Sequence, residues 1–102
     1  MGNAGHPRSR LRRALERGSL TTVLAAAAEV ERLDLDEALA VCARVARDDP
    51  ENFPRYAVRW VGLLVERRPS TTLLELRAAT DALIDLGVDQ SLAAARERLN
   101  LR

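Results

Sequence analysis

Apolar residues recur every three to four positions along most of this chain, with polar residues between them. That spacing is typical of amphipathic helices, and few runs show the strict alternation of a half-buried strand. The pattern predicts about five main helices, over residues 20–33, 35–47, 54–67, 72–86 and 89–99. Because the loops between them are short, consecutive helices are expected to run antiparallel. The sequence therefore predicts an all-α fold, a compact array of about five antiparallel helices in a helical-hairpin bundle.

Residues that start and stop helices support these bounds. Asp34 with Glu37, and Thr72 with Glu75, have the spacing of N-terminal capping pairs, in which an acceptor precedes a glutamate by three residues. Gly87 follows the last periodic residue of one helix and is a typical C-terminal stop. We therefore expect that helix to end just before Gly87.

Segment 54–67 is predicted to be the central apolar helix. Between Tyr56 and Val65 only Arg59 is charged, and apolar residues occupy every face. A helix that is apolar all round is normally enclosed by its neighbours. Trp60, the single tryptophan, is therefore expected to be a core residue rather than an exposed binding contact.

The N-terminal residues have no apolar period. Residues 1–9 contain two glycines, an asparagine and a proline, and are expected to form a disordered tail. Residues 10–17 are expected to form a short basic helix that Gly18 ends. The chain is of single-domain size, so residues 10–102 are predicted to form one helical domain.

The charges almost balance, with 16 basic residues, all arginine, against 15 acidic ones. Near the N-terminus, however, five arginines accompany one glutamate, and such a basic arm can neutralise phosphates. The candidate polyanion-binding residues are therefore Arg8, Arg10, Arg12, Arg13 and Arg17. Arg55 and Arg59 lie one helical turn apart beside aromatic residues, which makes them candidates for binding a partner, although pairing with acidic helices explains them equally well.

Residues that carry catalysis or bind metals are scarce. Cys42, the single cysteine, lies on an apolar helical face and is expected to be a small buried hydrophobe. His6, the single histidine, lies in the expected tail and cannot complete a metal site or serve as a positioned base. Asp48, Asp49 and Glu51 cluster at a helix junction without the spacing of a calcium loop. The sequence predicts no catalytic, cofactor-binding or metal-binding residues.

Nothing in the sequence indicates a membrane. No apolar run approaches the roughly 20 residues that span a bilayer. The first residues lack the apolar stretch of a secretory signal, and His6 stands where a myristoylation motif needs Ser or Thr. We therefore expect a cytoplasmic protein.

Three stretches carry a resemblance to a family, namely LDLDEAL (33–39), ARDDPENF (46–53) and AVRWVG (57–62). Through them, residues 19–86 resemble a group of short, uncharacterised, all-helical proteins of actinobacterial type. The resemblance covers about two thirds of the chain. It implies a bacterial, cytoplasmic origin, and it implies no activity, because none of its motifs carries chemistry.

These observations favour a small, non-catalytic protein-interaction or adaptor module whose partner is another protein. The Ala-rich stretch 25–28 permits close helix contact between chains, so a homodimer is expected. The alternative is a small nucleic-acid-associated protein that uses the basic arm. A third reading is an enzyme with carboxylate chemistry at residues 48–51.

Overall fold

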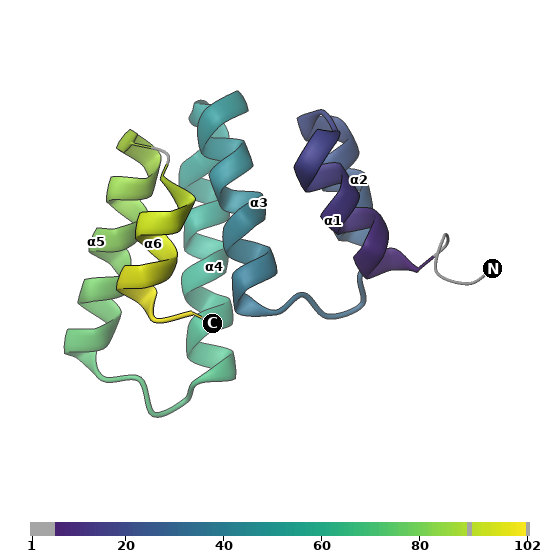
Figure 1. The fold of residues 1–102 in the computed structure, drawn as a ribbon. Coiled ribbons are helices and arrows are strands. Elements are labelled where there is room, and N and C mark those ends of the chain that lie inside the picture. Colours follow the sequence, from purple (N-terminus) through teal and green to yellow (C-terminus); the bar gives the residue numbers. More distant parts are fainter. Residues whose placement is uncertain (1–5, 90, 102) are drawn as a thin grey trace. The chain divides into compact units, whose positions relative to one another are not determined.

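The computed structural model of this protein describes residues 6–89 and 91–101, and every regular element within those ranges is helical (Figure 1). The predicted all-α class is therefore confirmed. The elements are, in order, α1 (Pro7–Arg17), α2 (Leu20–Glu29), α3 (Leu35–Asp48), the short 3-10 helix η2 (Pro50–Asn52), α4 (Phe53–Arg67), α5 (Leu73–Asp89) and α6 (Leu92–Leu99). By their internal contacts they fall into two compact units, Met1–Asp34 and Leu35–Arg102, which we describe separately. The single domain expected over 10–102 stays a prediction.

The first unit contains the pair α1 and α2. Leu11 and Ala14 of α1 are buried, as are Val23 and Ala26 of α2. Gly18 lies between the two helices, where an added Cβ would stand 2.9 Å from the carbonyl oxygen of Ala14. The turn is therefore too tight for a side chain, which agrees with the predicted end of the basic helix at this residue.

The start of α1 corrects the expected disordered tail over 1–9. The helix begins at Pro7, not at residue 10, and His6 is its N-cap, with Nδ1 accepting a hydrogen bond from the Arg8 backbone N–H at 3.3 Å. Proline suits the first helical position, where its missing N–H costs nothing. The tail was therefore predicted wrongly for residues 7–9, and residues 1–5 lie outside the described part of the chain.

In the second unit, α3 is the most enclosed helix. It contacts α4, α5 and α6, and eight of its 14 residues are buried. By contrast, α4 buries only Phe53, Trp60 and Leu64. The prediction that helix 54–67 is enclosed on every side is therefore wrong: Val58 is 71% exposed. Within the described residues of the second unit, α3 and α5 pack against α4 and leave Val58 uncovered.

Trp60 joins α4 to the beginning of α3. The side chain is 2% exposed, and its indole Nε1–H donates a hydrogen bond to the carbonyl oxygen of Leu35 at 2.9 Å. A buried indole N–H normally needs such a partner. The predicted core role of Trp60 is confirmed.

The predicted start of α5 is supported by its capping hydrogen bonds, whereas its predicted end is wrong. At its start, the Thr72 backbone N–H donates to Glu75 at 2.8 Å and the Glu75 backbone N–H donates to the Thr72 hydroxyl at 3.1 Å, as the capping pair predicts. At its end, the helix continues through Gly87 to Asp89. The ring of Phe53 lies where a Cβ on Gly87 would be, 2.8 Å away from Cε2. Gly87 therefore makes room for a neighbouring ring and does not stop the helix.

Ion pairs connect α6 to the rest of the second unit. Arg96 donates two hydrogen bonds to the Asp36 carboxylate of α3, at 2.6 and 3.0 Å. Arg98 pairs with Asp85 of α5. Bidentate arginine–carboxylate geometry fixes orientation as well as distance, so α6 is held against both helices.

Candidate functional site

The large aliphatic side chains that remain exposed are gathered on two helices. In the described residues, all six lie on α4 or α5: Val58, Val65, Leu73, Leu74, Ile84 and Val88. Single exposed aliphatic residues are ordinary on protein surfaces, but a contiguous apolar patch marks an interaction site more often. The part of the second unit formed by α4 and α5 is therefore a candidate interaction surface.

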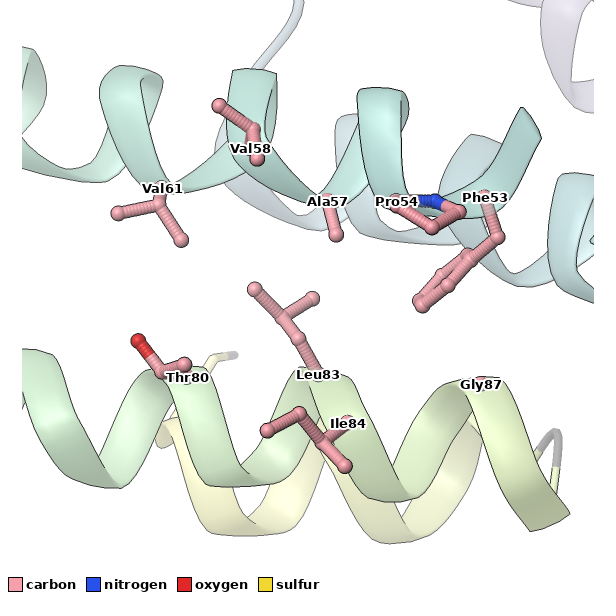
Figure 2. A pocket seen from close by; sticks show the side chains of 9 residues that line it. All are labelled: Phe53, Pro54, Ala57, Val58, Val61, Thr80, Leu83, Ile84 and Gly87. Atoms are coloured by element: carbon pink, nitrogen blue, oxygen red, sulfur yellow. The ribbon is translucent and has the colours of Figure 1, made fainter. Parts of the chain in front are cut away.

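The helical spacing of α4 explains its exposed residues. Phe53, Trp60 and Leu64 form one buried stripe, at spacings of seven and four residues. Ala57 and Val61 form a second stripe beside it, which faces α5 in Figure 2. Val58 follows Ala57 on the outer side of that second stripe. The apolar surface of α4 is thus wider than the part of the helix that α3 and α5 cover.

Between α4 and α5 lies a groove of about 510 Å³ (Figure 2). It is lined by Phe53, Pro54, Ala57, Val58 and Val61 of α4 and by Thr80, Leu83, Ile84 and Gly87 of α5. Of these residues only Thr80 has a polar side chain, and its hydroxyl donates to the Leu76 carbonyl at 2.9 Å within its own helix. The groove therefore offers an occupant mainly apolar surface, and the Thr80 hydroxyl is the only polar side-chain group among its lining residues.

We call the nine groove-lining residues, together with Val65 and Val88, the α4–α5 face. Val65 lies two helical turns beyond Val58, and Val88 lies one turn beyond Ile84, so both extend the apolar surface along their helices. Figure 2 places Phe53 beside Gly87 at one end of the groove and Val61 opposite Thr80 at the other. Helices commonly dock into grooves of this kind by inserting aliphatic side chains.

The two predicted partner-binding residues lie at different distances from this face. Arg55 precedes Val58 by one turn, Arg59 follows it directly, and both arginines are exposed. The Arg59 guanidinium carbon lies 5.6 Å from the centre of the Tyr56 ring, within range of a cation–π contact. Helical spacing places Arg59 about 160° round α4 from the groove-lining Ala57 and Val61, on the side of Tyr56, so only Arg55 lies near the α4 edge of the groove.

The five N-terminal arginines differ in their contacts. Arg8 donates to the carbonyl oxygen of Arg32 at 2.8 Å, and Arg10 pairs with Glu29 at 2.7 Å. The other three line a shallow hollow of about 290 Å³ on α1, together with a serine and a glutamate: Ser9, Arg12, Arg13, Glu16 and Arg17. Arg12, Arg13 and Arg17 therefore share one hollow with an acid among them, and polyanion binding by the five arginines stays a prediction.

Cys42 has the environment predicted for it. It is buried, and its Sγ–H donates to the carbonyl oxygen of Tyr56 at 3.5 Å. Burial raises the pKa of the thiol to about 12, because the charged thiolate is poorly solvated there. The thiol is therefore protonated at neutral pH and is a poor nucleophile.

The acidic cluster at the α3–η2 junction is engaged in local contacts. Asp48 accepts from Arg47 at 2.9 and 3.2 Å, and this hydrogen bonding lowers the pKa of the Asp48 carboxyl. Asp49 accepts from the Asn52 amide at 2.7 Å. Across residues 6–89 and 91–101, no three His, Cys, Asp or Glu side chains gather as metal ligands would.

Comparison with known proteins identifies no relative of this chain. No family model matches the chain, and no curated protein or solved structure is significantly similar to it. The resemblance to actinobacterial helical proteins therefore stays a prediction. None of the described helices has both the length and the apolar character needed to cross a membrane.

The groove itself was missed by the sequence analysis. The apolar residues of segment 54–67 predict a helix enclosed on every side, not a helix with an exposed apolar side. The sequence does contain apolar residues outside the buried stripe of each helix. On α4 these are Val58 and Val65, which lie off the stripe of Trp60. On α5 these are Ile84 and Val88, which lie off the buried stripe formed by Ala79, Leu83 and Leu86. The sequence does not show that α4 and α5 are neighbours, and so it does not show that these exposed apolar residues lie side by side.

Proposed function

We propose that this chain is a small, non-catalytic protein-interaction or adaptor module, which works without a cofactor and docks helical segments of a protein partner on the α4–α5 face. The observation that carries the proposal is the apolar groove, with aliphatic side chains exposed along both of its edges. We further propose that the helices form an antiparallel array and that the protein is cytoplasmic.

The energetics of the face favour a protein partner over a polar ligand. Complete burial of a valine or isoleucine side chain contributes about 1.5–3 kcal/mol. Val58 is 71% exposed and Ile84 58% exposed, so a covering partner gains a large part of that value at each position. With no unbonded polar side chain in the groove, shape and apolar contact determine what binds there.

The test is binding of amphipathic helical peptides selected from a displayed library. We expect saturable binding that Val58→Asp and Ile84→Asp each weaken at least about tenfold, because a charge must then be buried against apolar surface. The matched control is Leu74→Asp, an exposed aliphatic position on α5 that does not line the groove. Circular dichroism verifies that each variant is folded. Binding that Val58→Asp and Ile84→Asp leave unchanged would contradict the proposal.

A second candidate function is polyanion binding by α1, supported by Arg12, Arg13 and Arg17 on one exposed side of that helix. Each phosphate that an arginine neutralises adds close to one unit to the salt slope of binding. We prefer the first function because Glu16 lies among these arginines. We therefore expect no appreciable binding to DNA or RNA at physiological salt. Tight binding that replacement of the three arginines abolishes would reverse our preference.

A further inference from the structure

The last helix of the second unit, α6, buries little of its own surface. Of its eight residues only Ala95 is buried, while Leu92 and Leu99 are half-buried. In α3, by contrast, eight of 14 residues are buried. A helix as short as α6 is marginal in water by itself. It therefore depends on its contacts with α3 and α5 to stay helical.

Two ion pairs attach α6 to these neighbours. Arg96 donates two hydrogen bonds to the Asp36 carboxylate of α3, and Arg98 pairs with Asp85 of α5. The four side chains are 40–55% exposed, so water and salt reach both pairs. Ion pairs of this exposure contribute little to stability, and salt weakens them further. A small apolar contact and screened charges thus hold α6 in place.

The helix covers the side of α5 that is turned away from the groove. Asp85, the partner of Arg98, lies about 140–160° round α5 from the groove-lining Thr80 and Gly87. Ala82 precedes Asp85 by one turn and is 1% exposed, whereas Ala78, one turn further back, is exposed. Burial on this side therefore ends within one turn, as expected of cover by a helix as short as α6.

We propose that α6 is a detachable strap. It leaves α3 and α5 while the rest of the second unit stays folded, and it thereby uncovers the apolar side of α5 that carries Ala82. The two ion pairs determine how often α6 detaches, so detachment increases with salt concentration. The uncovered surface is separate from the α4–α5 face, and α6 keeps it closed for as long as it is bound.

Detachment of α6 is local because the central contacts of the unit do not involve this helix. The indole N–H of Trp60 in α4 donates to the Leu35 carbonyl oxygen of α3, and α4 and α5 pack against each other beside the groove. Segments with few buried apolar contacts open at a lower free energy than the core, and their amide hydrogens exchange earlier. The structure thus separates opening of α6 from unfolding of the unit.

Hydrogen exchange of the full chain, followed by mass spectrometry, tests the proposal. After correction for intrinsic rates, the amides of residues 95–99 should exchange at least about tenfold faster than those of α3. Their exchange should speed up about two- to fivefold when sodium chloride is raised from about 50 mM to about 1 M. Amides of α6 that exchange as slowly as those of α3 would overturn the proposal, and so would exchange that salt leaves unchanged.

Removal of one ion pair tests the role of charge. Asp36→Asn should speed exchange in α6 about two- to fivefold and leave exchange in α4 unchanged. The matched control is Glu29→Gln, which removes the similarly exposed Arg10–Glu29 pair of the first unit and should not affect α6. An effect on α6 that is equal for the two variants would overturn the proposal.

A thiol introduced by Ala82→Cys tests whether detachment uncovers α5. Circular dichroism verifies that the variant is folded. The introduced thiol should react with a thiol reagent faster than the buried Cys42 of the same molecule, and faster again at high salt, because only Cys42 requires unfolding of the unit. An introduced thiol that reacts no faster than Cys42 would overturn the proposal.

Discussion

Replacement of Trp60 is the perturbation whose cost the structure determines best. The side chain is almost fully buried and makes one hydrogen bond, from its indole N–H to the Leu35 carbonyl oxygen. Trp60→Ala removes the largest buried side chain of the protein and leaves a cavity, at a cost of about 3–5 kcal/mol. A domain of this size has a total stability of roughly 5–15 kcal/mol. We therefore expect Trp60→Ala to be poorly folded at room temperature.

Trp60→Phe separates the hydrogen bond from the packing. Phenylalanine keeps an aromatic ring at the position but cannot donate to Leu35, and a hydrogen bond of this kind contributes about 0.5–1.5 kcal/mol. Adding the loss of ring volume, we expect this variant to fold and to lose about 1–2 kcal/mol. The exposed substitution Arg77→Ala should change stability by less than about 0.5 kcal/mol.

Urea unfolding followed by far-ultraviolet circular dichroism measures all three variants, since the two Trp60 variants have no tryptophan left to report unfolding. In the wild type, tryptophan emission should be blue-shifted and should move to longer wavelength on unfolding. The reasoning is refuted if Trp60→Ala is within about 1 kcal/mol of the wild type, or if the folded protein already has red-shifted, readily quenched emission.

Three further predictions concern the second unit. Gly87→Ala should destabilise by about 1 kcal/mol, because the methyl group meets a packed ring, whereas Gly62→Ala, with nothing within 4 Å of its Cβ, should stabilise by up to about 1 kcal/mol in thermal melts. Cys42 should react with a thiol reagent only as fast as the protein unfolds, and rapid labelling of the folded protein would contradict its burial. The hydrogen bond from the Thr72 backbone N–H lowers the pKa of Glu75 from its ordinary value of 4.5. The stability that Glu75 contributes is therefore fully present above pH 4.5 and is lost as the pH falls through the lowered pKa of the folded protein. Glu75→Gln should therefore flatten the acid limb of a plot of Tm against pH, and an unchanged limb would show that this contact contributes nothing.

The positions of the helices could be predicted because their signals are local. Apolar spacing and the Thr72–Glu75 capping pair act within a few residues, and both appear in the structure as expected. The two wrongly predicted boundaries, the start of α1 and the end of α5, involve residues that occur in two different structural contexts. Pro7 breaks a helix interior but suits a helix start, and Gly87 stops a helix or admits a close neighbour.

The groove could not be predicted because it depends on which helices are neighbours. An apolar segment such as 54–67 indicates that its side chains need cover, but not whether the same chain provides it. In this structure Val58 and Ile84 receive no such cover. A chain with few helices per unit has too little surface to enclose every apolar face, and the remaining face is available to a partner.

Methyl NMR with a soluble paramagnetic agent tests the central claim, that the α4–α5 face is the docking surface, most directly. The agent broadens methyl signals that it can reach, so it reports the accessibility of Val58, Ile84 and Leu74 in one sample. We predict that Val58 and Ile84 become protected as a selected helical peptide is added, while Leu74 stays accessible throughout. Protection that spares Val58 and Ile84, or equal accessibility of all three in the bound state, would contradict the account.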